Sequence, residues 1–315
     1  MYRVGVDLGG TNIAVGLVDK NYKIISRGKV KTNLPRPAEE IFKDISKAID
    51  QALKKANIDI SQVKSIGVGT PGSVNKENGN IEFANNLNFF NVPAKKMLEE
   101  IIKKPVYLDN DANCAALGEA FAGAGKGVKS LVAVTLGTGV GSGIIIDGKI
   151  VSGVNHAAGE MGHMVIVVDG EPCNCGRCGC WEKYSSASAL VSQTKSAMRK
   201  NQDSLMWKLA DNSIHRVTGR TAFDAMRSGD KAGSEVVKKY VHYLAAGITN
   251  IINALQPQVL CIGGGIGNEG ETLLAPLRRH VEHERYSMHA VKQTEICQAV
   301  LGNDAGIIGA ALLDY

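Results

Sequence analysis

Hydrophobic residues near the start of the chain follow the two-residue period of β-strands. Three runs rich in β-branched residues are separated by short polar or glycine-containing turns, at residues 2–7, 13–19 and 24–30. Such runs joined by tight turns predict a three-stranded meander. The apolar positions then take helical spacing over residues 38–56, and residues 63–68 return to a strand pattern that Thr70-Pro71-Gly72 ends. The meander is therefore followed by a helix and another strand.

The rest of the chain continues to alternate between the two patterns. Strands are predicted at residues 106–108, 131–136, 143–146 and 259–262, and helices at residues 93–103, 113–122, 186–199, 231–255 and 305–313. Residues 134–139 (VTLGTG) repeat the pattern of residues 6–11 (VDLGGT), with Gly137 lying 128 positions after Gly9. One match this short is weak evidence of an internal duplication.

Composition and charge indicate a globular protein and disfavour a nucleic-acid-binding or membrane protein. A length of 315 residues predicts about two domains, and contents of 44% hydrophobic and 21% charged residues are those of an ordinary soluble protein. The net charge of +5 is mild, and the lysines lie on predicted helices rather than in a tract, which disfavours nucleic acid. Apolar runs such as residues 165–168 are far shorter than the roughly 20 residues that span a bilayer. The N-terminus enters a strand without a signal segment, so we expect a cytoplasmic protein with reduced thiols.

Cysteines are concentrated in one short segment that predicts a metal site. Four of the seven lie within eight residues, at Cys173, Cys175, Cys178 and Cys180. Interleaved glycines let such a loop fold around one ion, and Zn²⁺ takes four tetrahedral sulfur or nitrogen ligands, one of which His163 could supply. Disulfides need an oxidising compartment, and the spacing does not match the usual ferredoxin patterns, so a cluster or inert thiols are the weaker alternatives. Glu160 and Glu182 flank the segment, so the loop would carry carboxylates.

Three glycine turns follow β-runs and are candidates for binding phosphate, at residues 9–11, 137–141 and 263–265. A phosphate needs several backbone N–H groups at close range, which glycine permits. Asp7 precedes the first turn and is placed to hold Mg²⁺ directly or through water. One glycine turn alone is more often a tight hairpin, but three together are stronger evidence of a phosphate site. No P-loop motif is present, and the G-x-G-x-x-G match at residues 265–270 leaves only about 45 residues for the rest of a dinucleotide-binding domain.

A last polar motif, Asp109-Asn110-Asp111-Ala112-Asn113, allows two interpretations. Asp and Asn side chains cap the free N–H groups at the start of a helix. Alternatively, one carboxylate accepts the proton of an attacking hydroxyl, as the catalytic aspartate does in phosphoryl transfer to alcohols.

Together these motifs resemble the ROK family of sugar kinases, and within it the bacterial glucokinases. The resemblance runs in order through residues 7–11, 110–113, 137–139, 159–163 and 173–182, and the E-x-G-H segment before the cysteine loop is its most specific part. It implies an α/β, two-lobed actin-like (ribonuclease H-like) ATPase fold with a cleft between the lobes. The smaller lobe would comprise residues 1–112 plus 303–315, and the larger lobe, carrying the zinc loop, residues 113–302.

The resemblance also implies roles for individual residues. Asp111 would be the general base and Asp7 the residue nearest Mg²⁺. The implied sugar contacts are Gly72, Asn86, Asn110, Asp111, Glu160, His163 and Glu182. The implied nucleotide contacts are Asp7, Gly9, Gly10, Thr11, Asn12, Gly137, Thr138, Gly139 and Gly264. The implied zinc ligands are His163, Cys173, Cys175 and Cys180, which leaves Cys178 outside a closed, structural site.

The activity that the resemblance implies is ATP-dependent phosphorylation of a hexose, D-glucose to glucose 6-phosphate, in carbohydrate metabolism and glycolysis. Alternatives are a kinase for N-acetylmannosamine, N-acetylglucosamine or fructose, a sugar-sensing protein without catalysis, and a nicotinamide oxidoreductase. Many ROK glucokinases carry a tryptophan shortly after the Asn86-Leu87 pair, where this chain has Phe89 and Phe90. ROK repressors add an N-terminal DNA-binding domain, which we do not expect here. We expect hexose and ATP as partners, no nucleic acid, no membrane, and a homo-oligomer (dimer or tetramer).

Overall fold

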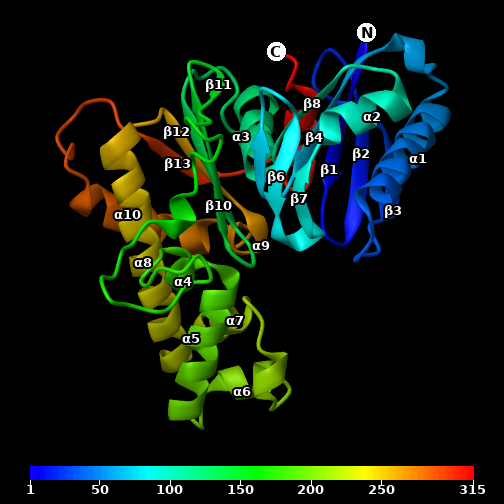
Figure 1. Cartoon of the computed structure of the whole chain (residues 1–315). Coiled ribbons are helices and arrows are strands. Elements are labelled where there is room, and N and C mark those ends of the chain that lie inside the picture. Colours follow the sequence, from blue (N-terminus) through cyan, green and yellow to red (C-terminus); the bar gives the residue numbers. More distant parts are fainter. The chain divides into compact units, whose positions relative to one another are not determined.

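The predicted meander forms one half of a mixed five-stranded sheet. The structure is a computed structural model that describes residues 1–315. The first sheet has the order β3-β2-β1-β4-β8 (Figure 1) and consists of β1 (Tyr2–Leu8), β2 (Asn12–Val18), β3 (Ile24–Lys31), β4 (Val63–Thr70) and β8 (Val106–Asn110). β1 pairs antiparallel with β2 and parallel with β4, and β4 pairs parallel with β8. The predicted meander, the helix after it and the strand that follows are therefore present in the structure.

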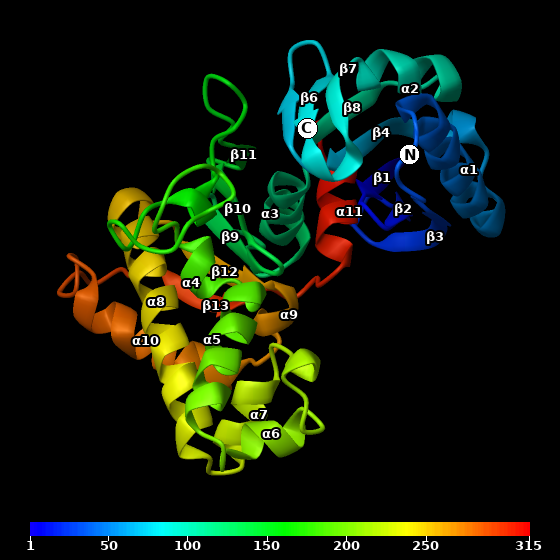
Figure 2. The same ribbon diagram turned by 60° about the horizontal axis from the view of Figure 1, so that its bottom comes forward.

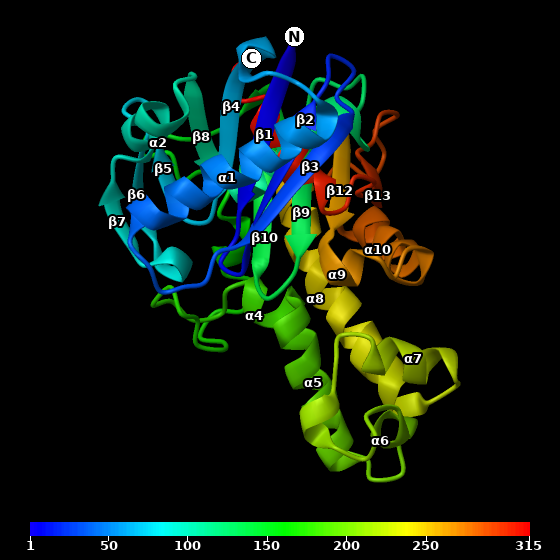
Figure 3. The same cartoon turned by 90° about the vertical axis from the view of Figure 1, so that its right-hand side faces the viewer.

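Helices cover both faces of this sheet, and glycines let them approach closely. Helix α1 (Ala38–Ala56) crosses one face, as Figure 3 shows, and a Cβ added at Gly28 would lie 1.8 Å from the carbonyl oxygen of Ala48. Helix α11 (Asp304–Ala311) packs on the other face, where a Cβ added at Gly5 would lie 1.8 Å from the carbonyl oxygen of Ile307. Helix α2 (Ala94–Ile102) packs beside α1, and helix α3 (Asp111–Ala122) packs beside α11.

A second five-stranded sheet repeats the topology of the first. Its order is β11-β10-β9-β12-β13, with β9 (Leu131–Leu136), β10 (Val140–Ile146), β11 (Lys149–Ile150), β12 (Val259–Gly263) and β13 (Glu295–Gln298). In both sheets three consecutive strands form a meander, a fourth strand pairs with the first of the three, and the fifth strand pairs with the fourth. The two similar segments at residues 6–11 and 134–139, which are 128 positions apart, therefore lie at equivalent places in two sheets of the same topology.

The remaining elements include several that the pattern analysis did not predict. A three-stranded sheet is made of β5 (Ser73–Asn75), β6 (Asn80–Ala84) and β7 (Phe89–Val92). The later helices are α4 (Glu182–Ser185), α5 (Ala187–Lys200), α6 (Leu205–Leu209), α7 (Thr221–Arg227), α8 (Lys231–Leu255), α9 (Gly264–Gly267) and α10 (Glu271–Glu284). Of the long helices among them, α5 and α8 were predicted and α10 was not. No helix is long and apolar enough to span a bilayer.

The chain divides into two compact units that differ from the predicted lobes. The first contains residues 1–133, 142–159 and 299–315, and the second residues 134–141 and 160–298. Helix α3 belongs to the first unit, although the predicted boundary at residue 112 placed it in the second lobe. The reason is the packing of α3 on α11, side by side in Figure 2, where a Cβ added at Gly309 would lie 1.7 Å from the carbonyl oxygen of Cys114.

Candidate active site

The carboxyl ends of three parallel strands bring two aspartates to one edge of the first sheet. Asp7 near the end of β1 is in register with Gly69 of β4, which is in register with Asp109 of β8. Because the strands are parallel, their carboxyl ends lie at the same edge, and Asp111 begins α3 directly after β8. A Cβ at Gly69 would lie 3.2 Å from Sγ of Cys114, so this glycine gives α3 room to begin close to the sheet.

The electrostatics of Asp7 and Asp111 favour a bound cation. Burial raises the pKa of Asp7 to about 6, and the negative charge of Asp111 adds to the increase. Burial of the carboxyl also raises the pKa of Asp111, although the residue as a whole keeps some exposure, and the N–H of Ala112, which donates to its Oδ1 at 2.8 Å, acts in the opposite direction. No cationic side chain lowers either pKa. Carboxylate oxygens are preferred ligands of Mg²⁺, so the donor set fits this ion.

The capping interpretation of the Asp109–Asn113 motif is correct for Asn110. Its Oδ1 accepts the N–H of Ala112 at 2.8 Å, and its Nδ2 donates to the carbonyl oxygen of Gly72 at 3.0 Å. Asp109 accepts Nδ2 of Asn113 at 2.9 Å and forms an ion pair with Lys76. Of the two carboxylates in the motif, Asp109 is therefore occupied within the protein, and Asp111 is the one that can act on a ligand.

Gly72 and Asn86, two further predicted sugar contacts, lie in the same unit. Gly72 has a positive φ of 90°, and a Cβ there would lie 1.9 Å from the carbonyl oxygen of Phe83, so the position requires glycine. Asn86 is exposed in the 3₁₀ turn between β6 and β7, and its carbonyl oxygen lies 4.0 Å from a Cβ built on Gly10. Asn86 therefore lies near the first glycine turn, and Gly72 lies against the end of β6.

The first glycine turn is held by Thr32, which the sequence analysis missed. The hydroxyl of Thr32 donates to the carbonyl oxygen of Gly9 at 2.6 Å, and its N–H donates to that of Thr11 at 3.0 Å. The N–H of Gly9 donates to the carbonyl oxygen of Asn12 at 3.0 Å. These hydrogen bonds use the carbonyl groups of the turn. The N–H groups of Gly10 and Thr11 have no partner in the protein and can donate to an anion.

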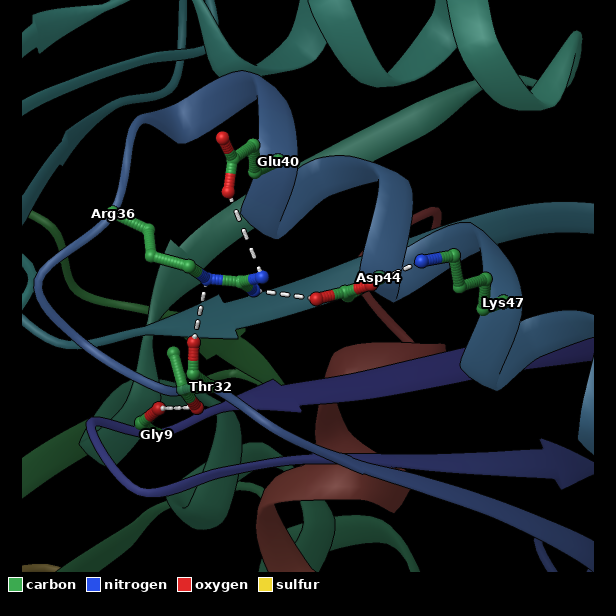
Figure 4. A network of polar contacts seen from close by, with 6 residues as sticks. All are labelled: Gly9, Thr32, Arg36, Glu40, Asp44 and Lys47. Atoms are coloured by element: carbon green, nitrogen blue, oxygen red, sulfur yellow. Dashed lines mark hydrogen bonds and ion pairs between the residues drawn. The ribbon is translucent and has the colours of Figure 1, made fainter.

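A charged network continues from Thr32 into helix α1 (Figure 4). Nε of Arg36 donates to the carbonyl oxygen of Thr32 at 3.2 Å, and Arg36 forms ion pairs with Glu40 and Asp44. Lys47 binds the other oxygen of Asp44 at 2.8 Å. No local pattern points to Thr32, because its partner Gly9 is 23 residues away in the sequence.

The second unit brings the other two glycine turns together. The N–H of Gly137 donates to the carbonyl oxygen of Gly139 at 3.0 Å, closing the turn around Thr138. Gly264 has a positive φ of 81°, and a Cβ there would lie 2.4 Å from the carbonyl oxygen of Leu136. Gly264 therefore lies against the residue that begins the turn at Gly137, and four predicted nucleotide contacts form one cluster.

Four potential zinc-ligand atoms gather at the cysteine loop and His163. Those of His163, Cys173, Cys175 and Cys180 all lie within 4.8 Å of one another. Sγ of Cys175 is 3.5 Å from Sγ of Cys180, and Sγ of Cys173 is 3.6 Å from Nδ1 of His163. Ligands of a tetrahedral zinc ion lie about 3.4 to 3.8 Å apart. Cys178 is exposed and lies outside the group.

The environment of Cys180 also fits a cation. Burial raises the pKa of this thiol to about 12, and the neighbouring thiol of Cys175 adds to the increase. Cys180 as a thiolate therefore needs a positive charge beside it, which a divalent ion supplies.

Glu182 connects the cysteine loop to the second glycine turn. Its Oε2 accepts the N–H of Val140 at 3.1 Å, and its Oε1 lies 3.8 Å from Sγ of Cys173. The preceding residue, Trp181, is fully buried and donates from Nε1 to the carbonyl oxygen of Tyr243 at 3.1 Å. Glu160 is exposed just before the 3₁₀ turn that carries His163. Of the predicted sugar contacts of this unit, His163 therefore belongs to the metal-ligand cluster, Glu182 approaches Cys173 of that cluster, and Glu160 lies three residues before His163.

Comparisons with known proteins identify the family. A model described as the ROK family matches residues 3–314. The glucokinase of Halalkalibacterium halodurans is 39% identical over 313 residues, which cover 98% of this chain and 94% of that protein. The chain belongs to the ROK family. The glucokinase of Thermotoga maritima is 37% identical over 310 residues, covering 98% of this chain and 95% of that protein.

Solved structures agree with this assignment. The crystal structure of a ROK family glucokinase from Streptomyces griseus in complex with glucose and AMPPNP superposes with a TM-score of 0.83 and 35% identity, covering 99% of both chains. The predicted α/β, actin-like fold class of the ROK sugar kinases is therefore confirmed. Family membership also agrees with rejecting a dinucleotide-binding interpretation of residues 265–270.

The clamp on the first turn predicts a specific effect of Thr32. In Thr32→Val the carbonyl oxygen of Gly9 loses its buried donor, so the turn loosens and an ATP analogue should bind about tenfold more weakly. Thr32→Ser keeps the hydroxyl and should bind nearly as well as the natural protein. Calorimetric titration with AMPPNP measures both. Equal affinities of the Val and Ser variants would contradict the role of the hydroxyl.

The ligand geometry predicts one zinc ion per chain in the cysteine loop. Cys173→Ala and Cys180→Ala should lose this metal and lower the melting temperature, because the loop then has too few ligands. Cys178→Ala is the matched control and should keep both. Elemental analysis and thermal unfolding check these outcomes. Loss of the metal in Cys178→Ala would show that the ligand set is wrong by one residue.

The raised pKa of Asp7 predicts a cost to stability. The carboxyl stabilises the fold only while protonated, and this contribution is lost as the pH rises from 3.8, the unfolded pKa, through the folded value of about 6. Without nucleotide and Mg²⁺, Asp7→Asn should therefore be more stable at pH 8 by about 1 to 3 kcal/mol. Denaturant unfolding at several pH values measures the difference, which should shrink toward pH 4. Asp50→Asn, an exposed change in α1, should show no such trend.

Proposed function

We propose that the protein phosphorylates D-glucose to glucose 6-phosphate with ATP as the donor. The observation that carries this proposal is the pair of Asp7 and Asp111 in one unit with the glycine turn at Gly9, in a member of the ROK family. It is supported by glucokinases that are 37% and 39% identical over nearly the whole chain, and by the related structure solved with glucose and AMPPNP.

In the proposed reaction Asp111 is the general base. Its raised pKa makes it a stronger base than an ordinary aspartate, so it accepts the proton of the attacking sugar hydroxyl more readily. The oxygen of that hydroxyl then forms a bond to the γ-phosphorus in line with the bond that breaks to ADP. Asn110 holds the first turn of α3 against Gly72 and so fixes the position from which Asp111 acts.

The nucleotide is proposed to bind through backbone groups. The turn of Gly9, Gly10, Thr11 and Asn12 offers N–H groups in the first unit, and Gly137, Thr138, Gly139 and Gly264 form the cluster in the second. Mg²⁺, when bound with ATP, would neutralise phosphate charge. Asp7 is the residue proposed to hold it, directly or through water, and its own raised pKa is the reason that a cation is favoured there.

The remaining sugar contacts are proposed to be Gly72 and Asn86 of the first unit and Glu160, His163 and Glu182 of the second. Carboxylates suit a sugar because they accept hydrogen bonds strongly from hydroxyl groups. Zinc in the cysteine loop would be structural, because four protein ligands leave no open position for water. Its proposed effect is to hold the cysteine loop beside Glu182, the first residue of α4.

We also infer a cytoplasmic location from the chemistry of the cysteines. All seven are free, and four ligand atoms of the zinc cluster include three thiols that must stay reduced to bind metal. The expected homo-oligomer stays a prediction.

The test of this function is a coupled assay with a panel of sugars. Glucose should be phosphorylated faster than N-acetylmannosamine, N-acetylglucosamine or fructose, and Asp111→Ala should lower kcat by about 10²-fold to 10⁴-fold while thermal unfolding changes little. Near-normal turnover in Asp111→Ala would exclude it as the base. A preference for another hexose would exclude glucose as the substrate, and sugar binding without ATP consumption would indicate a sensor.

A further inference from the structure

A second group of potential metal ligands lies where helices α8 and α10 pack together in the second unit. It comprises His242 of α8 with His280 and Glu284 of α10, and it shares no residue with the predicted catalytic, sugar, nucleotide or zinc sites. Figure 1 shows the two helices side by side. We propose that these three side chains form a second site for a transition-metal ion such as Zn²⁺.

The backbone places the three side chains for a common ligand. His280 and Glu284 are four residues apart in α10, so they project from the same face of the helix. The imidazole of His242 meets that of His280 with ring centroids 5.6 Å apart at an angle of 63°. The ligand atoms of all three lie within 4.8 Å of one another. Two nitrogens or oxygens on a tetrahedral zinc ion are about 3.3 Å apart, and exposed side chains can close this difference by small rotations.

An independent observation at Glu284 also points to a cation. This residue is the last of α10, where the unpaired carbonyl groups and the helix dipole disfavour a negative charge. The side chains of Glu284 and the two histidines form no ion pair or hydrogen bond with any other residue. The carboxylate thus lies in an unfavourable field with no compensating partner in the protein, and a divalent ion bound by the three groups would supply one.

The donor types select the metal. Two imidazoles with one carboxylate favour Zn²⁺, Ni²⁺ or Cu²⁺ over Mg²⁺ and Ca²⁺, which prefer oxygen ligands alone. His242 and Glu284 are exposed, so a coordination position stays open to water. This distinguishes the group from the cysteine cluster, whose four protein ligands complete a tetrahedron.

A metal ion bound here would link α8 to α10 close to the contact between α8 and the end of the cysteine loop. Tyr243 follows His242 in α8, and its carbonyl oxygen accepts Nε1 of the buried Trp181 at 3.1 Å. The ring of Tyr243 also contacts that of Tyr184, with centroids 4.7 Å apart. An ion that binds the folded protein and not the unfolded chain raises stability by mass action, so occupation should raise the melting temperature.

The test titrates the full-length protein, with the cysteine loop already loaded with zinc, with Zn²⁺ or Co²⁺ in the absence of nucleotide and sugar. We expect one further equivalent per chain in calorimetry. Bound Co²⁺ should give d–d absorption without the thiolate-to-cobalt charge-transfer bands of a cysteine site. The double variant His242→Gln/His280→Gln and, separately, Glu284→Gln should lose this binding. His283→Gln, an exposed histidine of the same helical turn outside the group, is the matched control and should keep it.

Thermal unfolding supplies the second measurement. The further equivalent of zinc should raise the melting temperature of the natural protein and of His283→Gln, but not that of the double variant. The proposal is overturned if the natural protein binds no further equivalent, if the double variant binds it as well, or if the His283 variant loses it. Because none of these measurements uses turnover, the result is independent of the proposed kinase activity.

Discussion

The parallel pairing of β1, β4 and β8 is the constraint on which the candidate site depends. It brings Asp7, the Gly72 turn and the start of α3 to one edge of the sheet, although these residues are far apart in the sequence. The close approach of α11 to the same strands is possible because Gly5 and Gly67 carry no side chain at the contact. A Cβ at Gly67 would lie 1.7 Å from the carbonyl oxygen of Ala310, so larger residues there would displace the helix and the sheet it supports.

Around this edge, polar groups adjacent to the proposed ligand-binding groups form hydrogen bonds and ion pairs within the protein. Thr32 donates hydrogen bonds to carbonyl groups of the first glycine turn, and the N–H groups of that turn stay available to a ligand. Asn110 accepts the first free N–H group of α3. Asp109 is neutralised by Lys76, so the charge that remains for a ligand is that of Asp7 and Asp111. The burial of Asp7 and the nearby charge of Asp111 together cost stability, and sites that bind charged ligands often carry such a cost.

Most of the regular elements were predictable because their patterns are long and local. Helices α1 and α8 match the predicted ranges, since each has a continuous apolar face of helical period. The hairpin strands β5 to β7 and the strand β13 were missed, because runs of three to five residues give only a weak period. Helix α3 begins two residues earlier than predicted because Asn110, rather than a residue further on, provides the cap.

The amino-acid pattern alone sufficed for the family motifs, for long elements such as α1 and α8, and for a metal site among the clustered cysteines, because glycine turns, clustered thiols and hydrophobic periods are properties of neighbouring residues. Only the tertiary structure decided that Thr32 holds the Gly9 turn, that Glu182 contacts the Gly139 turn, and that α3 belongs with α11. It also brought His242 to His280 and Glu284. These contacts join residues tens to hundreds of positions apart, and the packing of sheets and helices, rather than any local preference, sets them.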